Sequence, residues 1–142
     1  MKISRTLTAL VLCSTLTAVA ADTMTAARRT NAVNYKDRAL ASCLSAAYKG
    51  SSAGEDAEIS KSGFLEWTYY DEDKGNPATD QLVESYLRRD YRNPVEGYAH
   101  AQFNLLKCLD MYHSQELAEQ VRKYVPHPDW VGDTPVKKKQ IP

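Results

Sequence analysis

The first 21 residues determine which part of the chain folds, and in which compartment. Lys2 and Arg5 precede an uncharged run over residues 7–20, which ends in small residues that fit an A-x-A cleavage pattern. A basic start, a short apolar run and a small-residue end are typical of a secretory signal peptide, here with cleavage near Ala20 and Ala21. The run is shorter than the roughly 20 apolar residues of a spanning helix, and several Thr and Ser dilute it, which disfavours a membrane anchor.

Removal of residues 1–21 leaves two of the three cysteines, Cys43 and Cys108. In an oxidising compartment an even pair of cysteines is most simply a disulfide. Such a bond would close a loop of 65 residues, for which the loop-entropy relation gives roughly 4 kcal/mol of stabilisation. The alternative is a pair of buried free thiols.

The charge balance of the chain excludes several functional classes. The remaining 121 residues carry 16 basic and 18 acidic residues, and no second apolar stretch is long enough to cross a bilayer. This balance disfavours both a nucleic-acid binder held by a basic field and a strongly charged disordered chain. We expect neither nucleic acid nor membrane as a partner of the mature protein.

Apolar residues recur at helical spacing through most of the mature chain, and few stretches alternate as strands do. Asn34 as N-cap, Asn76-Pro77 as cap and first helical position, and Ser114 as a restart mark three helix starts. The pattern predicts an all-α fold, a single compact domain of about five helices with one disulfide. The expected helices cover about residues 34–50, 55–70, 76–89, 103–112 and 114–124.

The same pattern divides the mature chain into three parts. Residues 22–32 are small and polar and indicate a flexible lead-in, and residues 33–126 form the helical domain. Pro126 and Pro128 end the last helix, so residues 127–142 are expected to form an extended tail. The disulfide would tie the first helix to the fourth.

Two sequence patterns could indicate a catalytic nucleophile, but the secondary structure expected around each of them disfavours it. Residues 50–54 match G-x-S-x-G, but a nucleophile elbow needs a preceding strand, and here a helix is expected to end. Cys108 and His113 share one expected helix but lie about 140° apart around its axis. A cysteine in a disulfide is also no nucleophile. The sequence predicts no catalytic residue.

Metal and cofactor sites are not indicated either. Asp71, Asp73 and Asp80 could suggest a calcium loop, but Gly75 falls at the fifth position and Leu82 at the twelfth, where a Glu is required. The three histidines lack the spacing of H-E-x-x-H, and no glycine-rich phosphate loop is present. We expect no metal and no cofactor.

One loop stands out as a candidate binding element. Tyr91 and Tyr98 flank Asn93-Pro94 in a segment predicted to be irregular, and loops on a rigid scaffold are common carriers of recognition. Tyrosine is also enriched at protein interfaces. On residues alone, a protein-binding module is favoured over an enzyme.

Several stretches resemble a known family. They are Tyr-Leu-Arg-Arg-Asp-Tyr-Arg-Asn-Pro at 86–94, Phe-Asn-Leu-Leu-Lys-Cys-Leu-Asp-Met-Tyr-His-Ser-Gln-Glu-Leu at 103–117 and Val-Arg-Lys-Tyr-Val-Pro at 121–126. Together with Tyr35-Lys-Asp and Glu66-Trp67, they resemble the type VI secretion amidase-immunity proteins of the Tai/Rap group. The resemblance covers roughly residues 35–126 and not the tail.

The resemblance implies a periplasmic, helical, homodimeric protein without enzymatic activity. Such proteins bind and inhibit a secreted peptidoglycan amidase by placing a loop in its active-site cleft, which protects the cell from its own or its sisters' toxin. The family's paired cysteines match Cys43 and Cys108. The alternatives are a small helical enzyme of the periplasm and a general envelope adaptor. The expected toxin-binding residues are Tyr91, Arg92, Asn93, Pro94 and Tyr98, supported by Glu84, Arg88 and Arg89.

Overall fold

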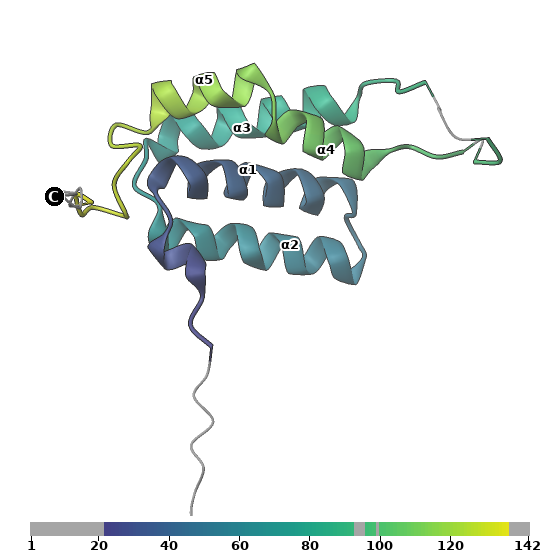
Figure 1. The fold of residues 1–142 in the computed structure, drawn as a ribbon. Coiled ribbons are helices and arrows are strands. Elements are labelled where there is room, and N and C mark those ends of the chain that lie inside the picture. The colour runs from purple at the N-terminus through teal and green to yellow at the C-terminus, as the bar shows by residue number, and fades with distance from the viewer. Residues whose placement is uncertain (1–21, 93–95, 99, 137–142) are drawn as a thin grey trace, which may run out of the picture.

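One helix, α1 (Asn31–Ala47), lies at the centre of the fold, and the other four helices all contact it. The computed structural model describes residues 22–92, 96–98 and 100–136, so the expected signal peptide over 1–21 lies outside it. Figure 1 shows α2 running beside α1 on one side, with α3, α4 and α5 on the other. The remaining elements are η1 (Thr25–Arg28), α2 (Ser52–Gly63), η2 (Phe64–Trp67), α3 (Glu72–Leu87), α4 (Asn104–Tyr112) and α5 (Gln115–Tyr124).

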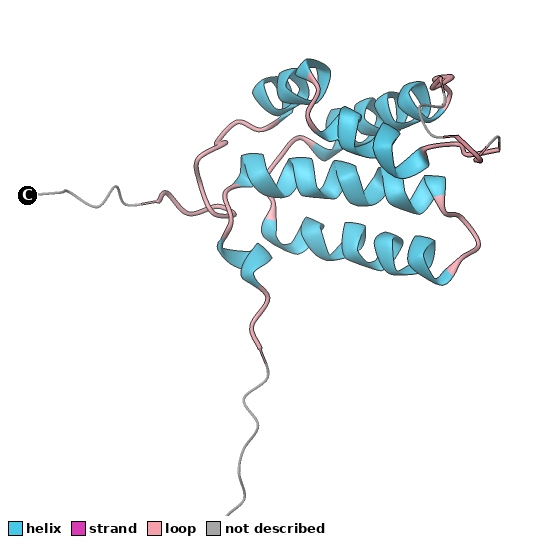
Figure 2. Ribbon diagram, turned by 45° about the vertical axis from the view of Figure 1, so that its right-hand side comes forward, coloured by secondary structure: helices cyan, strands magenta, loops and turns pink. Residues whose placement is uncertain are grey.

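The expected all-α class, with five helices in one domain, is confirmed (Figure 2). Within the described residues there is no strand beyond one isolated bridge between Val131 and Thr134. None of the helices in this part of the chain combines the length and the apolar character needed to cross a bilayer.

Side-chain caps explain where three of the helices begin. The Ser51 hydroxyl accepts the Gly54 N–H at the start of α2, and the Ser114 hydroxyl accepts the Leu117 N–H at the start of α5. The Asp71 carboxylate accepts the Lys74 N–H at the start of α3. Each cap satisfies an N–H group that has no partner within its own helix.

Helix α1 begins differently, because the C-terminal segment caps it. The Asn31 N–H donates to the Trp130 carbonyl at 2.7 Å, and the Ala32 N–H donates to the Pro128 carbonyl at 3.0 Å. The buried Asn31 amide donates to the carbonyls of His127 and Gly132 at 3.0 and 2.7 Å. Residues 127–132 therefore pack on the start of α1. The expectation of an extended tail from residue 127 is wrong for this segment.

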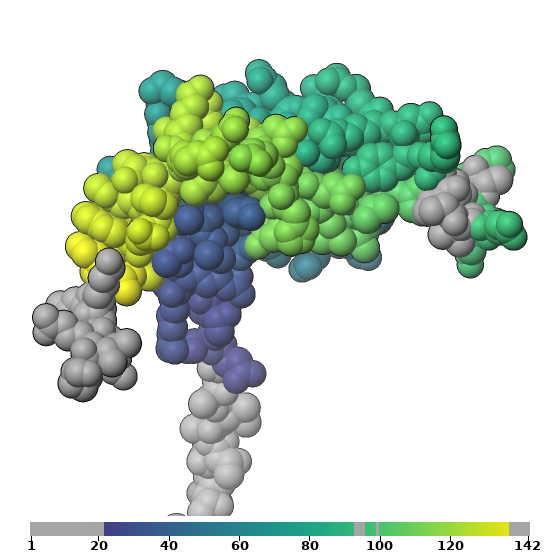
Figure 3. All heavy atoms as spheres, turned by 45° about the horizontal axis from the view of Figure 1, so that its top comes forward, coloured from purple at the N-terminus to yellow at the C-terminus, as the bar shows by residue number. Residues whose placement is uncertain are grey.

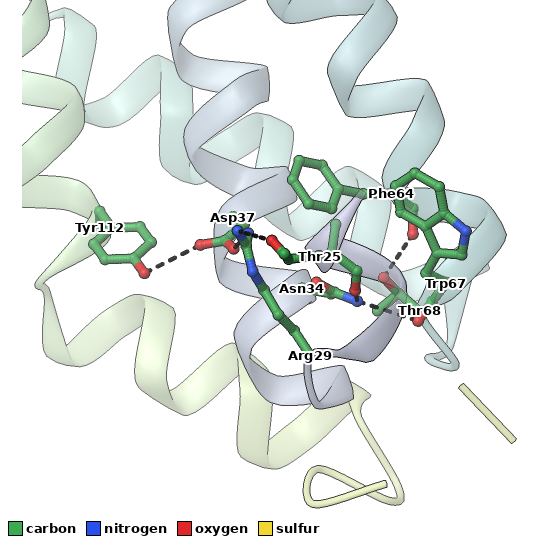
Figure 4. Close-up of polar contacts among 9 residues, drawn as sticks. Thr25, Arg29, Asn34, Asp37, Phe64, Trp67, Thr68 and Tyr112 are labelled. Carbon is green, nitrogen blue, oxygen red and sulfur yellow. Dashed lines mark hydrogen bonds and ion pairs between the residues drawn. The ribbon is translucent and has the colours of Figure 1, made fainter. Parts of the chain in front are cut away.

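Within the N-terminal lead-in, for which flexibility is expected, there is a short helix and a contact to α1. Residues 25–28 form the 3-10 helix η1, and α1 starts at Asn31. Arg29 pairs with Asp37 at 2.7 Å, and the Tyr112 hydroxyl of α4 donates to the other Asp37 oxygen at 3.1 Å (Figure 4). The carboxylate of one α1 residue thus fastens both η1 and α4.

Three helix starts lie earlier than the sequence predicts: α2 begins at Ser52 and not near residue 55, and α1 and α3 also begin early. Asn34 is not a cap: it lies within α1, fully buried, and its amide donates to the carbonyls of Ala26 and Trp67 (Figure 4). Pro77 lies inside α3 and not at its first position, because Asp71 caps the helix earlier. Acidic residues in the first turn, here Glu72 and Asp73, favour that earlier start.

The core joins α1, α3 and α5 through a buried tyrosine. The Tyr35 hydroxyl lies 3.2 Å from Thr79 Oγ1 and donates to Gln120 Oε1, also at 3.2 Å. Tyr70 packs edge-on against the Tyr35 ring, with the centroids 5.2 Å apart. The buried apolar cluster comprises Tyr35, Ala39, Cys43, Tyr70, Val83, Tyr86, Cys108, Met111, Leu117 and Val125.

The predicted disulfide between Cys43 and Cys108 is confirmed. It joins α1 to α4 across 65 residues of chain, with the two Cα atoms 5.6 Å apart. Both cysteines are completely buried. The bond therefore fixes α4, and with it the end of the segment that precedes α4.

Candidate functional site

The segment between α3 and α4 projects from one end of the helical body. Figures 1 and 3 show it standing away from the helices, at the end opposite to the C-terminal segment. It contains the loop over residues 91–98 predicted as the binding element. Asn93 and Pro94 lie outside the described residues.

Tyr91 lies at the base of this loop. It is half-buried, and its hydroxyl donates to Asp110 Oδ2 on α4 at 2.6 Å. Burial and the bond to Asp110 raise the pKa of the Tyr91 phenol, and the neighbouring Arg89 guanidinium opposes this rise. The side chain expected from the sequence to contact a partner directly therefore already has a partner within the chain.

Arg89 lies beside Tyr91 at the loop base. Its guanidinium lies over the Tyr86 ring, 3.3 Å from the ring centroid, and its Nη2 is 3.8 Å from Glu116 on α5. Glu84 and Arg88 form an exposed ion pair at 2.6 Å, one turn apart. Glu84 on α3, with Arg88 and Arg89 directly after this helix, thus forms a charged surface beside the loop. Arg89 is the one that contacts neighbouring elements.

The outer part of the loop presents side chains to solvent. Arg92 is exposed, and Tyr98 is 66% exposed. Gly97 has a φ of +84°, a left-handed conformation that glycine adopts without strain, and the Ala101 N–H closes a turn onto the Tyr98 carbonyl at 3.0 Å. Among the described residues of the predicted loop, Arg92 and Tyr98 are the two best placed to contact a partner.

Sequence reasoning missed an exposed apolar surface on α4. Leu105, Leu106 and Leu109 are 51%, 42% and 38% exposed, whereas Lys107 on the same helix is buried. They line a shallow hollow of about 490 Å³, together with Tyr48, Gln102, Phe103 and Asn104. We call these seven residues the α4 apolar surface. Four leucine or phenylalanine residues within 103–109 could have indicated it, because the buried side of so short a helix cannot hold all of them.

A second hollow lies between α2 and α3 over α1. Its volume is about 700 Å³, and its walls combine small residues with charged residues of both signs. Ser45 and Lys61 both contact Glu58 in its wall, and these contacts lower the Glu58 pKa. Its charged groups are largely paired with one another, which suits a solvated groove.

Both cysteines in the part of the chain that the structure describes are joined in the disulfide, and no group of three or more His, Cys, Asp or Glu is placed there to hold a metal ion. The arrangement suits contact with another macromolecule: a projecting loop with a braced base, next to an apolar surface.

Comparisons with known proteins agree with this arrangement. Residues 33–121 match the Tai4 family, described as type VI secretion system (T6SS) amidase immunity proteins. No curated protein sequence matches the chain significantly.

Two solved structures share the fold. One, from work on new type VI-secreted toxins and self-resistance proteins in Serratia marcescens, is 23% identical with a TM-score of 0.69, over 82% of this chain and 95% of the other. The second belongs to the Tae4/Tai4 effector–immunity system of Salmonella typhimurium, in a selenomethionine variant. It is 24% identical with a TM-score of 0.63, over 72% of this chain and 96% of the other.

Proposed function

The chain belongs to the Tai4 family of T6SS amidase immunity proteins, and from this premise we propose that it inhibits its cognate amidase by steric occlusion. The loop over residues 91–98 enters the active-site cleft of the enzyme and blocks substrate. The observation that carries the proposal is the projection of this loop from a helical body whose α4 is fixed by the disulfide. A braced loop loses little conformational entropy on binding, which favours tight association.

The contact residues follow from the loop's geometry. Arg92 and Tyr98 are exposed at the outer part, and Arg and Tyr are the residue types that most often dominate binding energy. Asn93 and Pro94 complete the proposed contact segment. Glu84 and Arg88 would meet the rim of the cleft.

The test is co-expression of this chain with the neighbouring amidase targeted to the periplasm, with lysis as the readout. The full chain should prevent lysis. Replacement of Arg92 or Tyr98 by Ala should weaken the purified complex by about 2 kcal/mol each, measured by titration calorimetry. Glu119→Ala on α5 serves as the control. Unchanged affinity in both loop variants would remove the loop from the mechanism.

The protein acts by binding and not by catalysis. Its family supports this, since the described function is immunity to an amidase. Purified protein incubated with peptidoglycan should release no stem-peptide fragments. Release of fragments would favour the small periplasmic enzyme, and failure to rescue cells from the amidase would favour the envelope adaptor.

The protein is proposed to work in the periplasm after removal of residues 1–21. The apolar run and small-residue end of that segment support export. The buried Cys43–Cys108 bond also fits an oxidising compartment. The N-terminal residue of protein isolated from the periplasm tests the cleavage, and it should lie near Ala21 or Asp22.

Association into a homodimer through the α4 apolar surface is part of the same proposal. Its polar members, Gln102 and Asn104, are uncharged. In a two-fold dimer each residue meets the same patch on its partner, so this surface would bring no like charges together. Leu106→Glu should convert a dimer to a monomer in light scattering, whereas Ile59→Glu, at an exposed position on α2, should not. A monomeric parent protein would contradict the dimer.

A further inference from the structure

We propose that Tyr91 and Asp110 form a latch that fixes the direction in which the 91–98 loop leaves the helical body. They are then positioning residues for inhibition and not contact residues. This inference rests on the proposed function of the loop. It differs from the sequence-based expectation, in which Tyr91 itself meets the amidase.

The latch joins the outgoing end of the loop to the helix that follows the loop. The chain leaves α3 at Leu87 and reaches Tyr91 four residues later. The Tyr91 hydroxyl then donates to Asp110 Oδ2 at 2.6 Å, in the last turn of α4. Because an ionised acceptor makes a short, strong bond with a phenol, this contact closes the base of the loop.

Lys107 of α4 also contacts both the end of α3 and Tyr91. It is buried, and its ammonium donates to the Leu87 carbonyl at 3.1 Å, near the end of α3. Such a cation stabilises the unpaired carbonyls of a helix C-terminus. The ammonium also lies 5.7 Å from the centre of the Tyr91 ring. The Tyr91 ring therefore lies near a charge that already joins α3 to α4, and its position is set by both contacts.

A second side chain at the loop base also has partners within the fold. Two residues before Tyr91, the Arg89 guanidinium is held over the Tyr86 ring and near Glu116 of α5. Arg89 and Tyr91 thus have their partners on two different helices. Arg89 also contacts the Tyr91 side chain itself, so the two residues anchor the base of the loop together.

The returning end of the loop is fixed as well. Phe103 precedes α4 with a φ of +53°, a left-handed conformation that is unfavourable for a bulky residue and persists only where its surroundings hold it. The next residue, Asn104, donates to the Ala47 carbonyl of α1 at 3.4 Å. The end of the loop that precedes α4 is therefore held by α1. The Tyr91–Asp110 bond sets the direction of the other end, which follows α3.

Single-group variants separate positioning from direct contact. Tyr91→Phe keeps the ring and removes the hydroxyl, and with it the contact to Arg89. Asp110→Ala removes the acceptor without altering Tyr91. If the two act as one latch, each should weaken amidase binding about tenfold, and the double variant should be no weaker than either. Asp110→Asn keeps an acceptor oxygen and should restore most of the affinity.

A matched control is available on the same helix. The Tyr112 hydroxyl also donates to an aspartate, Asp37 on α1, at 3.1 Å and away from the loop. Tyr112→Phe should leave amidase affinity unchanged within about twofold. Tryptic cleavage after Arg92 in the free protein gives a second readout, and it should become faster in Tyr91→Phe and Asp110→Ala but not in Tyr112→Phe.

The outcomes distinguish this inference from the proposed function. If Arg92→Ala weakens binding while Asp110→Ala and Tyr91→Phe bind like the parent, the loop contacts the amidase and the latch is overturned. If Tyr91→Ala weakens binding while Tyr91→Phe and Asp110→Ala do not, the Tyr91 ring is a direct contact, and the latch is again overturned. If Arg92→Ala and Tyr98→Ala bind the amidase like the parent, as Tyr91→Phe and Asp110→Ala do, the loop mechanism fails. The latch then has no role in inhibition.

Discussion

The side-chain amide of Asn31 joins the start of α1 to two other segments of the chain. Its Nδ2 donates to the carbonyls of His127 and Gly132, and its Oδ1 accepts the Tyr69 N–H at 2.9 Å. Asn31 is fully buried, and its replacement by Ala would leave these three backbone groups without their present partner. An unpaired buried polar group costs about 1–3 kcal/mol.

Asn31→Ala is therefore expected to lower the free energy of unfolding by about 3 kcal/mol. Urea denaturation followed by circular dichroism measures this change. Val33→Ala, at a largely exposed position two residues later, should cost less than about 0.5 kcal/mol. Equal stability of Asn31→Ala and the parent would show that the C-terminal segment does not depend on this amide.

Tyr70 makes stability depend on pH in the alkaline range. Its side chain is buried and donates to Asn76 Oδ1 at 2.6 Å, and burial raises its pKa to about 12 from an ordinary value of 10. The protonated phenol therefore contributes stability that is complete below pH 10 and is lost as the pH rises from 10 to about 12.

Tyr70→Phe should be less stable than the parent at neutral pH by about 1 kcal/mol, because one buried hydrogen bond is missing. This difference should shrink as the pH rises above 10, since the variant has no phenol at that position to ionise. Urea unfolding of both proteins across that range tests the prediction. Parallel pH profiles would contradict it.

At the scale of elements, α2 approaches α1 closely at one glycine. A Cβ on Gly54 would overlap the carbonyl of Tyr48, at the end of α1, whereas a Cβ on Gly63 would meet only Trp67 ring atoms at 3.9 Å. Gly63 has helical dihedral angles, with φ of −60°. The same substitution should therefore have opposite effects at the two ends of α2.

Gly54→Ala should lower the free energy of unfolding by about 2 kcal/mol, because α2 must move away from the backbone of α1. Gly63→Ala should raise it by roughly 0.5 kcal/mol through reduced freedom of the unfolded chain. Thermal denaturation of each variant measures these two changes in stability. A destabilised Gly63→Ala or a neutral Gly54→Ala would contradict this account of the contact.

The presence of the helices could be predicted from local sequence patterns. Where some of them start, and which of their residues are exposed, depends on contacts with distant parts of the chain. Ser114 was correctly predicted as a start because its own hydroxyl caps α5. The start of α1 could not be predicted, because its N–H groups bond to residues about 100 positions later. The α4 apolar surface was missed for a related reason. Only the packed fold shows that Lys107 faces α3 while three leucines face solvent.

For the whole molecule, the disulfide is the covalent link between the central helix and the helix that carries the loop. Cys43→Ala combined with Cys108→Ala should lower the free energy of unfolding by roughly 4 kcal/mol, because the 65-residue loop is no longer closed. Urea unfolding with and without reductant measures it. Reductant should destabilise the parent and leave the double variant unchanged, and a parent insensitive to reductant would contradict the prediction.

The capping of α1 by residues 128 and 130 makes the start of the central helix depend on a segment about 100 positions later. The first long helix of the sequence is completed by one of the last described segments. In the export proposed above, α1 would cross the membrane before the residues that cap it. We expect the start of α1 to be completed only after residues 128 and 130 have also crossed.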